Sequence, residues 1–128
     1  MVYGAKQVVL KKGDDMTNQS FYLDLIPKGV PPVIRVSQND EGQTWLISLL
    51  FNKSPFTIPA GAAVYVQGTK PNGATFKEAC TFSGNVVTAT ESQDMTDICG
   101  NVRAEIVIEK DDETIHSLNF IVSVEQTT

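Results

Sequence analysis

The sequence predicts an all-β protein, an antiparallel β-sandwich of the immunoglobulin-like or jelly-roll-like type, and three observations lead to this prediction. Apolar and polar residues alternate along residues 101–109 and again along 117–125, with a charged stretch at 110–114 between them. Alternation with period two gives a strand one buried face and one wetter face. Turn-forming residues recur at roughly ten-residue spacing, as in sandwiches and barrels. The one plausible helical segment, 92–98, is short.

The length of 128 residues is that of one domain, large enough to bury a core without a disulfide framework or a metal. We expect an N-terminal arm or pair of edge strands with a proline-rich linker at 1–32, a β-sandwich domain at 33–125 and a polar tail at 126–128. Short strands are expected near 6–10 and 20–25. The prolines at 27, 31 and 32 then restrict the residues before them to extended backbone.

Turn chemistry separates the strands of the expected sandwich. The clearest signal is Lys70–Gly73, where Pro71 presets φ and the following Asn-Gly tolerates the positive φ of a tight turn. The helical segment begins at a capping residue, Ser92, and stops before Gly100. The expected strands are 33–36, 44–51, 62–68, 75–82, 86–90, 101–109 and 117–125.

The strand at 44–51 is apolar on both faces. Trp45 shares a face with Ile47 and Leu49, whereas Leu46 and Leu50 point the other way. We expect this strand either to be covered on both sides or to carry an interface.

Charge and cysteine content restrict the classes of function. The formal net charge is −5, from 15 acidic and 10 basic residues, so binding of nucleic acid through a basic patch is not expected. No secretory signal and no membrane-spanning run are expected, since the longest apolar run is Leu49–Phe51. Cys80 and Cys99 are expected to be free thiols of a reducing cytoplasm, with a bridge between them as the alternative.

No catalytic, metal or cofactor site is expected. His116, the single histidine, lies near a strand end and no serine has the surroundings of a nucleophile. The acidic runs at 14–15 and 111–113 lack the spacing of a calcium loop and are interpreted as solvated turns. A carboxylate pair for sugar hydrolysis could come from Glu91, Asp94 and Glu105, but any acidic chain offers such pairs by chance.

The order of turns and strands resembles the N-terminal domain of the baseplate upper protein family of tailed phages and prophages of Gram-positive bacteria. The resemblance extends from about Lys6 to Glu125. The segments that carry it are Arg35–Gly42, Pro55–Val64, Gly68–Gly73, Cys80–Val87, Met95–Thr96, Gly100–Ile108 and Ser117–Glu125. Members of this family often continue into a linker helix and a receptor-adaptor domain, whereas this sequence ends at Thr128.

The resemblance implies a β-sandwich with a structural role in the virion. It implies a non-catalytic attachment module that docks on the baseplate or tail, commonly as a trimer, with other virion proteins as partners. Because the adaptor part is missing, a capsid-attached head-fibre or decoration protein that uses the same module is an alternative. The resemblance brings no catalytic residues.

The N-terminal arm supplies the candidate partner contacts, namely Tyr3, Val8, Val9 and Leu10. An extended arm can pair with the sheet edge of a neighbour, although an edge strand within the same molecule explains the pattern equally well. Two other hypotheses were considered. One is a carbohydrate-binding module with Trp45 and Tyr65 as stacking platforms, and the other is a small hydrolase that depends on His116.

Overall fold

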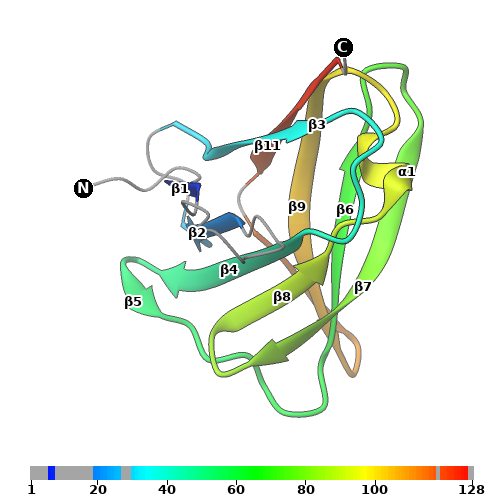
Figure 1. Ribbon diagram of the computed structural model, residues 1–128. Helices are drawn as coiled ribbons and strands as arrows, with labels where there is room; N and C mark the ends of the chain where they lie inside the picture. Colours follow the sequence, from blue (N-terminus) through cyan, green and yellow to red (C-terminus); the bar gives the residue numbers. More distant parts are fainter. Residues whose placement is uncertain (1–5, 8–18, 27–29, 118, 127–128) are drawn as a thin grey trace.

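The computed structural model describes residues 6–7, 19–26, 30–117 and 119–126, and in this part of the chain it confirms the all-β fold (Figure 1). Eleven strands and one short helix are present among these residues. They are β1 (Lys6–Gln7), β2 (Gln19–Asp24), β3 (Val33–Ser37), β4 (Thr44–Phe51), β5 (Ser54–Pro55), β6 (Ala63–Thr69), β7 (Thr75–Ser83), β8 (Val86–Thr90), α1 (Gln93–Thr96), β9 (Gly100–Lys110), β10 (Glu113–His116) and β11 (Phe120–Glu125).

The strands form two layers that share β7. Along the hydrogen-bonded path the strand order is β1-β2-β4-β8-β7-β6-β9-β11-β3, with β5 on β4 and β10 on β9. The first part of β7 pairs with β6 and its last residues, Thr81–Ser83, pair with β8. This strand therefore passes from one layer to the other, and the sheet curls into a nearly closed barrel (Figure 1).

The gap between β2 and β3, near the two ends of this path, is bridged by one side chain. Gln19 is buried, and its Nε2 donates to the carbonyl oxygen of Arg35 on β3 at 3.2 Å and to Oε1 of Gln43 at 3.0 Å. The side-chain amide thus links the two layers where no backbone ladder joins them among the described residues.

Two strand pairs are parallel, which the prediction of an antiparallel sandwich did not include. β2 runs parallel to β4, and β3 runs parallel to β11. Alternation of apolar and polar residues fixes which face of a strand is buried, but it carries no information on strand direction. β9 and β11 pair antiparallel, as in the antiparallel sandwich that the sequence predicts.

Strand β2 is part of the folded body, although the sequence placed it with the N-terminal arm or edge. Phe21 and Leu23 are 2% and 1% exposed and belong to the main core. The folded body therefore begins by Gln19, and the proline-rich stretch lies between two of its strands.

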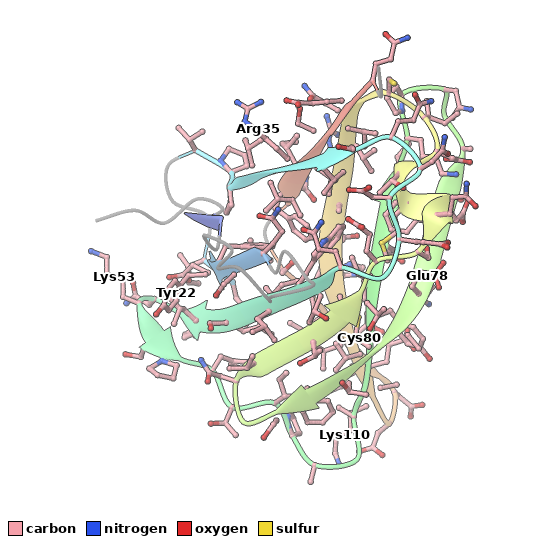
Figure 2. All side chains as sticks on the ribbon, in the orientation of Figure 1. Tyr22, Arg35, Lys53, Glu78, Cys80 and Lys110 are labelled. Atoms are coloured by element: carbon pink, nitrogen blue, oxygen red, sulfur yellow. The ribbon has the colours of Figure 1, made fainter. Side chains whose placement is uncertain are left out.

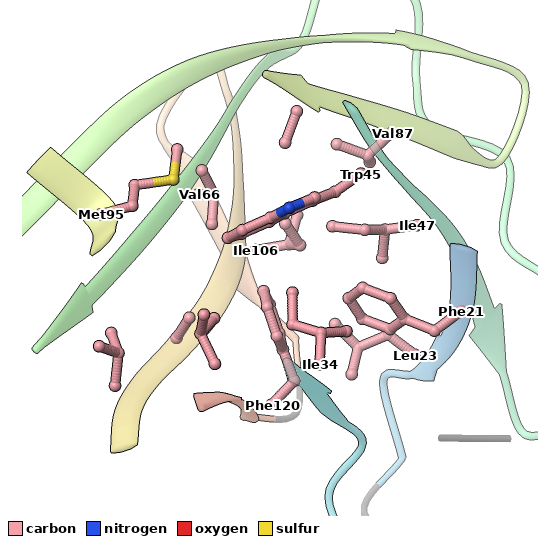
Figure 3. Close-up of a cluster of buried hydrophobic side chains, with 14 of the residues drawn as sticks. Phe21, Leu23, Ile34, Trp45, Ile47, Val66, Val87, Met95, Ile106 and Phe120 are labelled. Atoms are coloured by element: carbon pink, nitrogen blue, oxygen red, sulfur yellow. The ribbon is translucent and has the colours of Figure 1, made fainter. Parts of the chain in front are cut away.

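The core is a single cluster between the two layers, with aromatic rings at its centre (Figure 3). The Phe120 ring lies 5.0 Å from that of Phe21 and meets the Trp45 indole edge to face at 6.3 Å. Ring pairs of this geometry stabilise a fold beyond the area they bury. Trp45, Ile47 and Leu49 of β4 all point into this cluster, as their shared face predicted.

Three local features differ from the sequence predictions. Strand β10 follows a two-residue turn in which Asp111 has φ 55°, so the charged break is a tight hairpin. Strand β5 lies in a segment expected to be a loop. Helix α1 is shorter than 92–98, and the Ser92 hydroxyl donates to Glu78 at 3.2 Å instead of capping the helix.

Charged side chains hold two of the turns in place. Asp24 accepts hydrogen bonds from the backbone N–H groups of Ile26, Asn52 and Lys53 at 2.8–2.9 Å, and the last two have positive φ. At the other end of the molecule, the buried Lys70 ammonium contacts Asp94 and Asp97 at 2.6 and 3.0 Å, joining a turn to α1.

Candidate partner-binding surface

A polar groove of about 460 Å³ lies on the outer face of the layer formed by β6, β7 and β9. Strand register arranges its walls in two rows. Gln67 lies between Lys77 and Glu105, and Thr69 lies between Thr75 and Arg103. Asn119, just before β11, also lines the groove. Because alternate residues of a strand point to the same face, these outward positions form one continuous surface.

Hydrogen bonds fix the first row. Gln67 Nε2 donates to Glu105 Oε2 at 2.7 Å, and the same oxygen lies 3.3 Å from Nδ1 of His116 on β10. On the other side of Gln67, Lys77 Nζ lies 4.4 Å from the centre of the Tyr65 ring and 3.5 Å from Glu109. These contacts hold amide, carboxylate and ammonium groups at defined positions along one side of the groove.

The second row contains a guanidinium group, that of Arg103, which is accessible to a ligand. Arg103 is exposed and has no ion-pair partner among the described residues. Thr69 and Thr75 lie beside it in register and also line the groove. A guanidinium beside neutral polar groups is suited to bind a carboxylate or another acceptor-rich group of a partner.

The floor of the groove depends on a glycine. A Cβ at Gly68 would lie 2.8 Å from the Phe76 ring and 2.8 Å from the Arg103 carbonyl oxygen. The missing side chain lets the Phe76 ring, which is 5% exposed, pack across the strand toward the core. Gly68 thus allows the close approach of β6 to its two neighbours.

The predicted arm contacts lie outside the described residues, because the structure does not describe Tyr3, Val8, Val9 or Leu10. Their role stays a prediction. The described part of the arm, Lys6–Gln7, pairs antiparallel with β2 and so forms an edge strand within the molecule.

The proposal of Trp45 as a stacking platform for sugars is wrong, because this side chain is 0% exposed in the core. Tyr65 does lie on the outer face, half-buried beside Lys77. His116 is exposed at the end of β10 and pairs with Glu105, as expected of a residue at the rim of the sheet.

The three acids that could have formed a carboxylate pair for sugar hydrolysis occupy three different environments. Asp94 pairs with Lys70, Glu105 lies on the groove wall, and Glu91 is buried. Both cysteines are free, and burial raises the pKa of the Cys80 thiol to about 11. Among the described residues no cluster of three or more histidine, cysteine or acidic side chains could hold a metal ion. In the same part of the chain, no helix has the length and hydropathy of a membrane span.

Sequence reasoning missed the groove because its residues come from separate strands. Gln67, Thr75 and Arg103 each look like an ordinary outward position of a half-exposed strand. Only the register brings them together, and no turn or motif in the sequence encodes that register directly.

Comparison with known proteins finds this fold in a phage protein. No family model and no curated protein matches the sequence. Among solved structures, the N-terminal domain of phage TP901-1 ORF48 superposes with a TM-score of 0.70 at 12% sequence identity. The match covers 84% of this chain and 98% of that one. The two chains therefore share a fold, and the ORF48 domain is spanned almost completely.

Proposed function

We propose that this chain is a non-catalytic structural protein of a bacteriophage virion, an attachment module that docks on the baseplate or tail as the adsorption apparatus assembles. The observation that carries the proposal is the fold shared with nearly the whole N-terminal domain of phage TP901-1 ORF48. The order of sequence motifs from Arg35 to Glu125, which resembles the N-terminal domain of baseplate upper proteins, supports it independently of the shared fold.

The groove on β6, β7 and β9 is the docking surface in this proposal. It presents Arg103 without an ion-pair partner among the described residues, next to amide and hydroxyl groups held in register. An acidic domain with net charge −5 repels most acidic surfaces. A local guanidinium gives it a place where a carboxylate of another virion protein can bind in one orientation.

The location on the particle is the direct test. Gold-labelled antibody against this chain, imaged by electron microscopy on intact particles, should mark the baseplate or the distal tail. Label on the head would instead support the capsid-attached head-fibre or decoration protein. Particles that contain none of this chain would contradict a virion role altogether. Native mass spectrometry of the isolated protein tests the trimer that the family resemblance implies.

The docking surface is tested by charge reversal. Arg103→Glu should leave the domain folded, because Arg103 is exposed, and should reduce its incorporation into particles by tenfold or more, on the order of the loss of one charge-assisted contact. Lys53→Glu is the matched control. It makes the same charge change in the turn between β4 and β5 (Figure 2), and Lys53 does not line the groove. Equal incorporation of both variants would show that the groove is not the docking surface.

The arm provides a second, separable contact. Serine in place of Tyr3, Val8, Val9 and Leu10 should keep the core intact and weaken assembly if the arm pairs with a neighbour. Normal assembly of this variant would show that the arm does not contact a partner and serves only as an edge strand within its own domain.

Carbohydrate binding at the same groove is the second candidate, favoured by its amide and hydroxyl walls and by Tyr65 at its margin. Titration of the protein with host cell-wall polysaccharide separates the two functions. Saturable binding that is lost in Arg103→Glu, with particle assembly unchanged, would support recognition of host sugars over docking.

A further inference from the structure

The buried acid Glu91 lies at the end of β8, and neither of its carboxylate oxygens has a hydrogen-bond partner among the described residues. Its exposed fraction is 2%. The Trp45 indole nitrogen is equally buried and also makes no hydrogen bond to a described residue. Buried polar groups are almost always satisfied, so a carboxyl group left in this way needs an explanation.

The surroundings of Glu91 favour its neutral form. Burial, and then the charge of Asp40, raise the pKa of Glu91 to about 7, while the N–H groups of Trp45 and Gln43 lower it in part. Those two N–H groups face the carboxyl group without reaching it at hydrogen-bond geometry. Asp40 is thus the charged group that acts on Glu91 from the neighbouring loop, and the two aspartates at α1 are paired with Lys70.

The backbone of Glu91 also forms hydrogen bonds that hold the adjacent loop against this end of the barrel. Its N–H donates to the Gln43 carbonyl at 2.8 Å, and its carbonyl accepts from the Gly42 N–H at 2.9 Å. The loop 38–43, which connects β3 to β4, is therefore hydrogen-bonded directly to the residue that carries the buried acid.

The same loop is also hydrogen-bonded to α1 and the residue that follows it. Asn39 N–H donates to the Thr96 carbonyl at 2.9 Å, and the Thr96 hydroxyl donates to the Asp40 carbonyl at 2.7 Å. Gln38 Nε2 donates to the Asp97 carbonyl at 3.1 Å. Loop 38–43, Glu91 and α1 form one hydrogen-bonded unit that covers the Trp45 end of the core.

We propose that the proton on Glu91 controls the closure of this unit, so that loop 38–43 and α1 open more readily from the core once Glu91 is ionised. An ionised carboxylate in this position is compensated only in part by the N–H groups of Trp45 and Gln43, and it stands beside the negative charge of Asp40. When loop 38–43 and α1 open, water hydrates the Glu91 carboxylate. The closed form binds the proton more tightly than the open form, so the opening equilibrium must shift as the pH rises.

Hydrogen exchange measured by NMR tests the closure. Protection factors of the Gly42 and Glu91 amides, which are corrected for the pH dependence of exchange itself, should fall by about 20-fold between pH 5.5 and pH 7.5. Glu91→Gln keeps the size of the side chain without the charge, and its protection factors should be flat over the same range. His116→Gln is the control, because it removes the single histidine of the sequence at a position on β10 that pairs with Glu105, and it should behave as the wild type does.

The fluorescence of Trp45, the single tryptophan, gives a second measurement on the folded protein. Emission should change with an inflection near pH 7 in the wild type and in His116→Gln, and not in Glu91→Gln. A fluorescence inflection with constant protection factors would mean that Glu91 ionises inside the closed form, which overturns the proposal. Parallel pH dependence in the wild type and Glu91→Gln would overturn it as well.

Discussion

The contact between Gly68 and Phe76 allows a prediction whose size follows from the structure. In Gly68→Ala the new Cβ would lie 2.8 Å from the ring and 2.8 Å from the Arg103 carbonyl oxygen. Both distances are too short for real Cβ contacts, and the second neighbour is backbone. Overpacking of this kind typically costs about 1–3 kcal/mol. Alanine recovers about 0.4–1 kcal/mol by restricting the unfolded chain, so we expect a net destabilisation of about 1–2 kcal/mol.

Urea unfolding followed by Trp45 fluorescence measures this value, because Trp45 lies in the core. Phe76→Leu serves as the second variant of a double-mutant cycle. A smaller side chain removes the clash with the ring and leaves the clash with the carbonyl. The cost of Gly68→Ala should therefore fall by about 1 kcal/mol in the Phe76→Leu background without vanishing. A neutral or stabilising Gly68→Ala would refute the close approach of β6 to its neighbours.

Three further predictions concern charged side chains. Glu91 has a folded pKa of about 7 against 4.5 for the ordinary group; as pH rises through this window the folded state should lose about 3 kcal/mol. Equilibrium unfolding of Glu91→Gln should lack this loss, and a wild type whose stability rises with pH across the same window would contradict it. Asp24→Ala removes the acceptor of three backbone N–H groups and should cost about 2 kcal/mol in urea unfolding; Asp112→Ala, in an exposed turn, should be near neutral. Lys70→Met should cost about 1 kcal/mol because its aspartate partners are partly exposed; hydrogen bonding to Asp94 first of all raises the pKa of Lys70, so the difference from wild type should shrink only at strongly alkaline pH.

Sequence reasoning predicted some strands with the correct bounds. The bounds expected for 44–51 and 86–90 are those of β4 and β8, because both strands have a buried face against one core. The turn predicted at Lys70–Gly73 from its proline and glycine is present, and Gly73 has φ 90°. The short helix was found, although its capping residue bonds elsewhere.

The remaining features depend on contacts between distant parts of the chain. β2 was placed outside the sandwich because a proline-rich stretch follows it, yet pairing with β4 buries Phe21 and Leu23. β10 was not predicted because the charged residues at 110–114 look like a break between strands, whereas they contain a two-residue hairpin turn. Nothing in the sequence around Glu91 indicates that it is buried, since the loop hydrogen-bonded to it comes from residues 38–43. In each case tertiary packing overrode a correct local interpretation.

Strand β9 also has a consequence for how the chain acquires its structure. It pairs with β6 on one edge and with β10 and β11 on the other, and β11 pairs in turn with β3. Val33 thus finds its neighbour Ile121 only after the 87 residues between them have been synthesised. High contact order of this kind slows folding to the millisecond-to-second range and leaves unpaired edges exposed meanwhile. Synthesis of many copies at once would then make chaperones, rather than thermodynamic stability, the limit on yield.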